Sequence, residues 1–131
     1  MLKIKFIFFD LSGTLVKMRP ATLLVNLSLL KDLTKKYSLG IITGARRTET
    51  VNILNKLKIY KRFKIIITAD DSRLKKPDPR LFPKFKISAY IGDAKKDVIF
   101  AGNANITFFR INKKYNINQV IKKMPQAISR N

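Results

Sequence analysis

The chain of 131 residues contains no cysteine and no histidine. Without cysteine it can form neither a disulfide nor a thiolate metal site. Without histidine it has no imidazole to serve as a general base or as a metal ligand. Any catalysis must therefore use carboxylates, lysines and hydroxyl groups, together with a metal ion that prefers oxygen ligands.

Long hydrophobic runs are also absent from the sequence. No stretch approaches the ~20 apolar residues that a membrane-spanning helix requires, and residues 1–6 carry charges where a signal peptide would have its apolar segment. Internal repeats and low-complexity linkers do not occur, and 46% of the residues are hydrophobic, which is typical of a globular protein. We therefore expect a single cytoplasmic domain over residues 1–131 that makes no contact with a membrane.

Acidic residues are scarce, since 8 Asp and Glu stand against 28 Lys and Arg and give a formal net charge of +20. Two explanations remain open. The charge reflects a lysine-rich overall composition, or it attracts a polyanionic partner such as nucleic acid. Lysine outnumbers arginine and no aromatic stacking platform is evident, so a nucleic acid would be bound without sequence-specific contacts.

Hydrophobic strands alternate with amphipathic helices along the chain. Leucines at helical spacing follow Pro20, and Val51, Leu54 and Leu57 share one face of a second predicted helix. The strands are predicted over residues 4–9, 39–43, 63–68, 89–91 and 106–111, and the helices over residues 21–37, 46–57, 97–102 and 118–124. Continuous apolar strands between such helices indicate a parallel sheet covered on both faces. We predict an α/β fold, Rossmann-like and doubly wound, with a mainly parallel five-stranded sheet.

Asp10 follows the first predicted strand and is followed at once by a Ser-Gly-Thr turn. Open α/β sheets bind ligands at the carboxyl ends of their strands, where this carboxylate falls. A carboxylate can attack a phosphoryl group, and Gly13 lets the backbone turn sharply beside a phosphate. Taken alone, Asp10 could equally be a residue that merely ends a strand.

Asp93 closes the fourth predicted strand, and Asp97 lies four residues further on. Two or three carboxylates with no histidine suit Mg²⁺, which prefers oxygen ligands. A helix-capping aspartate would give the same pattern. Three of the eight acidic residues nevertheless fall at Asp10, Asp93 and Asp97, and this concentration favours a site.

Thr43 and Gly44 follow the second predicted strand, just before a helix begins. A hydroxyl and free N–H groups at a helix N-terminus bind phosphate well, although a simple helix cap explains them too. Lys75 and Lys76 lie in a loop rich in proline and charge. Either lysine could neutralise a phosphate and a neighbouring carboxylate.

Taken in order, hydrophobic-Asp-x-x-Gly-Thr, hydrophobic-Thr-Gly, Lys-Pro-x-Pro and Gly-Asp-x-x-x-Asp resemble the motifs of the haloacid dehalogenase (HAD) superfamily of phosphohydrolases over residues 6–97. The resemblance implies a Rossmann-like sheet and Mg²⁺ as the cofactor. It implies that Asp10 is the nucleophile and a metal ligand and that Thr43 holds the phosphoryl group. Lys76, or alternatively Lys75, would bridge the nucleophile and the phosphate.

The same resemblance assigns the remaining acidic residues. Asp93 would bind the metal, and Asp97 would support the metal shell or the lysine. Phosphatases of this superfamily usually carry a second aspartate two residues after the nucleophile, where this chain has Ser12. The Ser12 backbone carbonyl can still reach the metal, but its hydroxyl is a poor acid and base. Loss of such a group typically costs ~10²–10⁴-fold in rate.

The spacing of the motifs leaves no room for a cap domain, because 33 residues separate Asp10 from Thr43 and again Thr43 from Lys76. We therefore expect an open site suited to a large or polyanionic phosphorylated substrate, with nucleic acid as a candidate partner. Two functions remain open: a Mg²⁺-dependent phosphohydrolase that forms an aspartyl phosphate, or a protein of the same fold that has lost turnover and binds Mg²⁺ and phosphate or nucleic acid. The oligomeric state is unknown.

Overall fold

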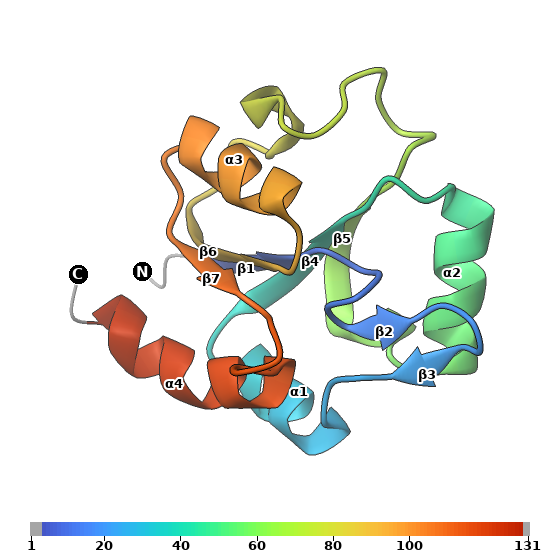
Figure 1. Cartoon of the computed structure of the whole chain (residues 1–131), viewed down its shortest axis with the longest axis horizontal. Helices are drawn as coiled ribbons and strands as arrows, with labels where there is room; N and C mark the ends of the chain where they lie inside the picture. The colour runs from blue at the N-terminus through green and yellow to red at the C-terminus, as the bar shows by residue number, and fades with distance from the viewer. Residues whose placement is uncertain (1–3, 130–131) are drawn as a thin grey trace.

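Five parallel strands form the main sheet of the computed structural model, which describes residues 4–129 (Figure 1). The order across the sheet is β5-β4-β1-β6-β7, so the first strand lies in the centre. All four neighbouring pairs are parallel. The strands are β1 (Phe6–Phe9), β4 (Ser38–Ile42), β5 (Phe63–Ile67), β6 (Ile87–Gly92) and β7 (Phe108–Arg110).

Helices cover both faces of this sheet (Figure 1). Three of them, α1 (Leu27–Thr34), α2 (Arg47–Lys56) and α4 (Ile117–Ser129), contribute buried residues to the hydrophobic cluster on one face. The other face is covered by α3 (Lys95–Asn103) and by the segment that contains the short helix η2 (Pro79–Leu81). The predicted fold class, a doubly wound α/β sheet, is confirmed.

The central strand is apolar throughout because both of its faces are buried. Ile7 and Phe9 belong to the cluster beneath α1, α2 and α4, whereas Phe6 and Phe8 belong to the cluster beneath α3. Successive side chains of a strand point to opposite faces, so a strand buried on both faces reads as a continuous apolar run. Gly40 makes room for Phe8, since a Cβ at Gly40 would overlap the Phe8 ring.

The segment after the first motif differs from the prediction. The leucine spacing predicts one helix over residues 21–37, but Thr22–Leu23 forms β3, which pairs antiparallel with β2 (Val16–Lys17). The helix α1 begins only at Leu27, where the Asn26 side chain accepts a hydrogen bond from the Leu29 N–H at 3.1 Å. Asn26 is a strong N-cap residue, and it rather than Pro20 sets the start of the helix.

Other boundaries differ by smaller amounts. The buried face of α2 is formed by Thr50, Ile53 and Leu54, whereas Val51 and Leu57 are only half-buried. The strand β6 is longer and β7 shorter than predicted, and α3 begins two residues earlier. The helix α4 continues past Pro125 to Ser129 instead of ending at residue 124. The structure also contains a short helix η1 (Tyr60–Arg62).

The segments that connect the strands of the main sheet consist of short helices, a hairpin and loops. Between Asp10 and Thr43 lie only the β2–β3 hairpin, α1 and β4, and between Thr43 and Lys76 lie α2, η1, β5 and a loop. Neither connection contains an inserted domain within residues 4–129. In this part of the chain no helix combines the length and the apolar character needed to cross a bilayer.

Candidate active site

Three strands that are neighbours in the sheet deliver polar side chains to one edge. Asp10 follows β1, Thr43 follows β4 and Asp93 follows β6. Backbone pairing holds these ends in register: the Asp10 N–H donates to the Ile91 carbonyl at 2.9 Å, and Phe9 of β1 lies opposite Ile41 of β4. The parallel order of the strands therefore gathers residues that are far apart in the sequence.

Lys76 connects two of the carboxylates. Its Nζ lies 2.8 Å from Asp10 Oδ1 and 3.1 Å from Asp97 Oδ1. The Lys76 side chain is only 7% exposed and that of Asp97 only 2%, so both charges depend on each other for solvation. Lys75 lines the same cavity but makes no ion pair within the described residues. The lysine contact thus belongs to Lys76.

Asp97 is held by donors at both of its oxygens. Oδ1 accepts from Lys76 and from the Tyr90 hydroxyl at 2.8 Å, and Oδ2 accepts from the Ala94 N–H at 3.2 Å. Its position in the first turn of α3 explains the last contact, because the first N–H groups of a helix lack partners inside the helix. Asp97 therefore gives Lys76 a second carboxylate partner beside Asp10.

Three carboxylates converge in this cluster. Asp10, Asp93 and Asp97 each offer one oxygen, and these oxygens all lie within 4.8 Å of one another. Gly13 packs directly against Asp93: its φ is +82°, and a Cβ there would overlap the Asp93 carboxylate. A glycine is required on both counts. Carboxylate oxygens without imidazole or thiolate are the ligands that Mg²⁺ prefers.

Burial and charge shift the pKa values in the cluster. Burial raises the pKa of the Asp10 carboxyl to about 6, and the charges of Asp97 and Asp93 act in the same direction, while Lys76 opposes them. Burial, followed by the charges of Asp10 and Asp97, raises the pKa of the Tyr90 hydroxyl well above its usual range. Tyr90 therefore stays a hydrogen-bond donor at neutral pH.

A cavity of about 670 Å³ opens above the cluster, and Ser12, Thr43 and Gly44 line it. The Thr43 hydroxyl accepts a hydrogen bond from the Ala45 N–H at 3.1 Å. The Gly44 N–H has no hydrogen-bond partner among residues 4–129, and Ser12 is exposed. The structure thus brings every predicted site residue to one cavity.

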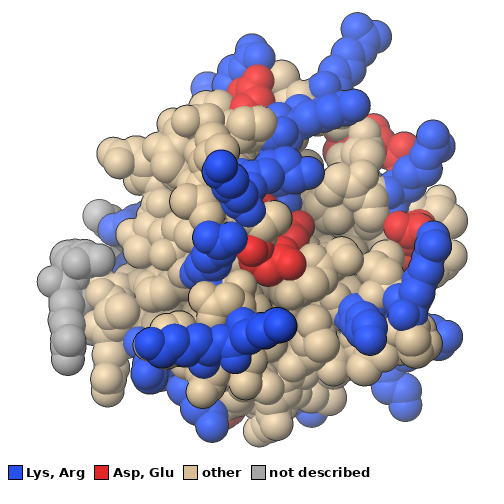
Figure 2. Space-filling view, in the orientation of Figure 1, with Lys and Arg blue, Asp and Glu red and all other residues tan. Residues whose placement is uncertain are grey.

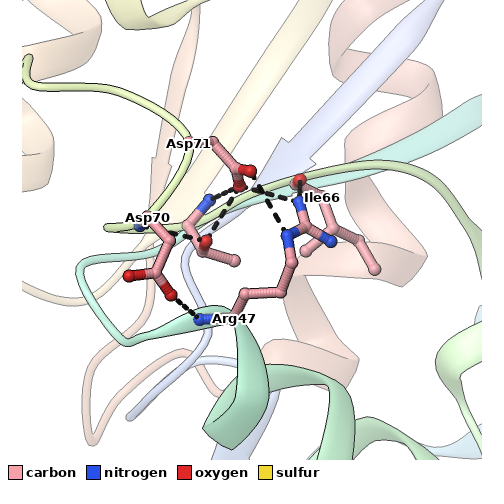
Figure 3. Close-up of polar contacts among 5 residues, drawn as sticks. Arg47, Ile66, Asp70 and Asp71 are labelled. Carbon is pink, nitrogen blue, oxygen red and sulfur yellow. Dashed lines mark hydrogen bonds and ion pairs between the residues drawn. The ribbon is translucent and has the colours of Figure 1, made fainter.

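The N-terminus of α2 beside this cavity is already occupied by a side chain. The Asp70 carboxylate accepts from the Arg47 N–H at 2.7 Å (Figure 3). Asp70 supplies the cap that Arg46, at the N-cap position, does not provide. The first helical N–H of α2 is therefore not free for a phosphate, in contrast to the expectation from the sequence.

A second network stabilises the same corner. The Arg47 guanidinium contacts Asp71 at 2.7 Å and the Ile66 carbonyl at 2.8 Å, and Asp71 also accepts from the N–H and the hydroxyl of Thr68 (Figure 3). This network joins α2 to the end of β5. No local sequence pattern identifies Arg47, Asp70 or Asp71 as partners, because Arg47 is separated from the two aspartates by 23 and 24 residues.

A parallel α/β sheet with carboxylates and a lysine at its carboxyl edge defines a Rossmann-like protein with an enzyme-type site. The family model described as haloacid dehalogenase-like hydrolase matches residues 24–111, or 88 of 131 residues. The chain belongs to this family of hydrolases, which confirms the expected enzyme class. The matched range includes Thr43, Lys76, Asp93 and Asp97, whereas Asp10 precedes it. No curated protein matches the sequence.

Solved structures share the fold at low sequence identity. A protein of Bacillus subtilis assigned as a HAD hydrolase, YfnB, whose structure contains magnesium, has a TM-score of 0.80 and 11% identity over 98% of this chain and 100% of that one. A HAD phosphatase from Thermococcus onnurineus has a TM-score of 0.79 and 16% identity over 95% and 98%. Phosphatase Tt82 from Thermococcus thioreducens has a TM-score of 0.70 and 21% identity over 86% of this chain and 48% of that one.

Proposed function

We propose that this hydrolase is a Mg²⁺-dependent phosphatase that forms an aspartyl phosphate on Asp10. The observation that carries the proposal is the position of Lys76, whose ammonium lies 2.8 Å from Asp10 and 3.1 Å from Asp97 at the edge of an open cavity. A lysine in this place can neutralise both the attacking carboxylate and a phosphate beside it.

Mg²⁺ fits the residues at this edge. Asp10 and Asp93 would hold it together with the Ser12 backbone carbonyl, and Asp97 would act on the metal shell through its contact with Lys76. The carboxylate oxygens within 4.8 Å of one another carry more negative charge than one lysine offsets. When bound, the ion would supply positive charge against the phosphate oxygens.

The side chains around Asp10 have distinct roles in the proposed reaction. An Asp10 oxygen attacks phosphorus and forms an O–P bond, while the bond from phosphorus to the leaving oxygen breaks. The leaving oxygen takes a proton from water, and a second water then releases phosphate and restores the carboxylate. The Thr43 hydroxyl and the unpartnered Gly44 N–H would hold the phosphoryl oxygens.

The serine at position 12 favours one alternative function for a protein of this fold. Its side chain is exposed at the cavity, in the position where a carboxylate would protonate the leaving group and activate water. A hydroxyl performs both tasks poorly near neutral pH. In the alternative, the protein binds Mg²⁺ and a phosphorylated ligand but turns the ligand over slowly or not at all.

The experiment that tests the proposal measures Mg²⁺-dependent phosphate release from p-nitrophenyl phosphate. We expect slow turnover by the natural chain, none by Asp10→Asn, and a rate about 10²-fold or more higher for Ser12→Asp. Asp93→Asn should require more Mg²⁺ for half-maximal rate. Turnover that survives in Asp10→Asn would contradict the proposal, and turnover by Ser12→Asp alone would favour the binding protein.

The substrate is proposed to be a large phosphorylated molecule, and a polyanion such as a nucleic acid is one candidate. The absence of an inserted domain over the cavity within residues 4–129 supports this proposal, because small substrates usually need a lid to exclude water. Figure 2 shows Lys and Arg side chains above, below and to the left of a small group of acidic side chains near the centre of the visible face.

A further inference from the structure

A second pocket lies at the opposite edge of the sheet, and we call it the amino-edge pocket. Its volume is about 300 Å³. Six of its eleven lining residues are Lys or Arg, compared with 28 of 131 in the whole chain, so the enrichment exceeds what a lysine-rich composition alone gives. The six cations are Lys5, Lys35, Lys36, Lys61, Arg62 and Lys64.

The topology of the sheet brings these cations together. Lys5 precedes β1, Lys35 and Lys36 lie between α1 and β4, and the remaining three lie in η1 and at the start of β5. Because β5, β4 and β1 are neighbours and parallel, their amino ends meet at one edge. The Ser38 N–H, for example, donates to the Lys5 carbonyl at 2.9 Å. No local sequence pattern marks this convergence.

The positive charge of the amino-edge pocket is almost uncompensated. No acidic residue lines it, and the one ion pair that its cations form within residues 4–129 joins Lys35 to Asp32 at 3.4 Å, with both side chains largely exposed. The cavity above the carboxylate cluster is different, because its lining includes four acidic side chains and three lysines. Of these two pockets, the one with the uncompensated positive charge is thus on the side away from Asp10.

We propose that the amino-edge pocket binds the sugar-phosphate backbone of single-stranded nucleic acid. Six cations exceed what one phosphate needs, and together they can neutralise several successive phosphates of one strand. Tyr37 lines the same pocket with a half-buried ring that also packs against the core, and the exposed part of this ring can contact a base. The pocket is concave and mostly polar, which suits a flexible strand better than a flat lipid surface.

This binding site is independent of the proposed phosphatase reaction. The five residues of β4 rise ~3.3 Å each and separate the two edges of the sheet by about 16 Å, with Asp10 and Thr43 at the far edge. A small phosphate ester at Asp10 therefore touches none of the six cations. The two proposals can fail separately.

The test compares two variants of the full chain that lose the same charge. One replaces Lys35, Lys36, Lys61 and Lys64 by glutamine. The control replaces four exposed lysines elsewhere, in the β7–α4 connection and on α4: Lys113, Lys114, Lys122 and Lys123.

Fluorescence anisotropy would measure binding of a labelled single-stranded oligonucleotide of about 12 nucleotides, with EDTA present. Thermal melts and p-nitrophenyl phosphate turnover would verify that both variants are folded.

The pocket variant should bind at least tenfold more weakly than the natural chain, and the control should change by less than about threefold. The slope of log K against log salt should also become shallower by ~0.7 for each phosphate that the pocket variant no longer neutralises. Equal weakening in both variants would show that the overall positive charge of the protein, rather than the amino-edge pocket, binds the oligonucleotide. This result would overturn the proposal. Absence of oligonucleotide binding by the natural chain would overturn it as well.

Discussion

Lys76 is a buried cation between two carboxylates, an arrangement that is costly to solvate unless each charge keeps its partners. Its Nζ contacts Asp10 and Asp97, and Asp93 adds a third carboxylate nearby. One lysine does not balance three carboxylates. Burial, together with this imbalance, raises the pKa of Asp10 to about 6, so the site is expected to lower stability until a cation binds.

Asp10→Asn should therefore stabilise the metal-free protein at pH 7.5, by about 3 kcal/mol at most. The pKa of Asp10 is about 6 in the fold and 3.8 ordinarily, so between about pH 4 and pH 6 the folded state binds more protons than the unfolded chain. Stability from this group falls as pH rises through that window. The gain should thus be largest above pH 7 and vanish near pH 4.

Urea denaturation in EDTA at several pH values measures this effect, with Asp32→Asn as an exposed control. If Asp10→Asn lowers stability at pH 7.5, the ion pair with Lys76 outweighs burial and charge repulsion. Added Mg²⁺ should stabilise the natural chain and leave Asp10→Asn almost unchanged, because the variant lacks one proposed ligand.

At the scale of elements, the helix α2 depends on residues outside itself. Its N-cap residue, Arg46, makes no side-chain cap, and Asp70 from the β5–β6 loop accepts the first helical N–H instead. Arg47 and Asp71 then join the helix to β5. These contacts fix the turn that begins at Thr43, so they determine how the proposed phosphate-binding residues are presented.

Asp71→Asn should lower the free energy of unfolding by about 1 kcal/mol at pH 7, since the ion pair is partly exposed. The Arg47 hydrogen bonds lower the pKa of Asp71 to about 2. Its contribution is therefore present above about pH 4 and is lost as pH falls toward 2. The difference between the two proteins should close over that range.

Chemical denaturation at a series of pH values provides the measurement for Asp71. Asp32→Asn again serves as the matched control, because its partner Lys35 and Asp32 itself are largely exposed. A stability difference that persists unchanged at pH 2 would show that the carboxylate charge of Asp71 is not what stabilises this corner.

For the whole molecule, the net charge of +20 has two opposite consequences. Repulsion among the cations destabilises the compact state, whereas the same field attracts a polyanion. Salt screens both interactions. Rising salt should therefore strengthen the fold while it weakens nucleic-acid binding.

The melting temperature should rise by a few degrees between about 0.01 M and 0.1 M NaCl, where the screening length falls from ~30 Å to ~10 Å. Differential scanning calorimetry measures this, and the variant with four glutamines in the amino-edge pocket should show a smaller rise. An unchanged melting temperature would mean that the cations lie too far apart to repel each other appreciably.

Local sequence patterns are enough to predict the fold class and the motif positions. Buried strands are continuous apolar runs, and Asp10, Thr43 and Asp93 follow such runs directly, so the strand order alone implies that they share an edge. The β2–β3 hairpin escapes prediction because two-residue strands have no periodicity. The start of α1 at Asn26 is not predicted, because the leucine spacing continues on both sides of Asn26 and indicates a longer helix.

Only the tertiary structure decided which residues from distant parts of the sequence contact one another. Two adjacent lysines are equivalent in sequence, yet Lys76 rather than Lys75 contacts Asp10, which lies 66 residues away. The cap that Asp70 gives to α2 and the six cations of the amino-edge pocket likewise join segments from different strands. The physical reason is that a strand or helix is specified by its own residues, whereas the distances between such elements exist only once the sheet has placed them side by side.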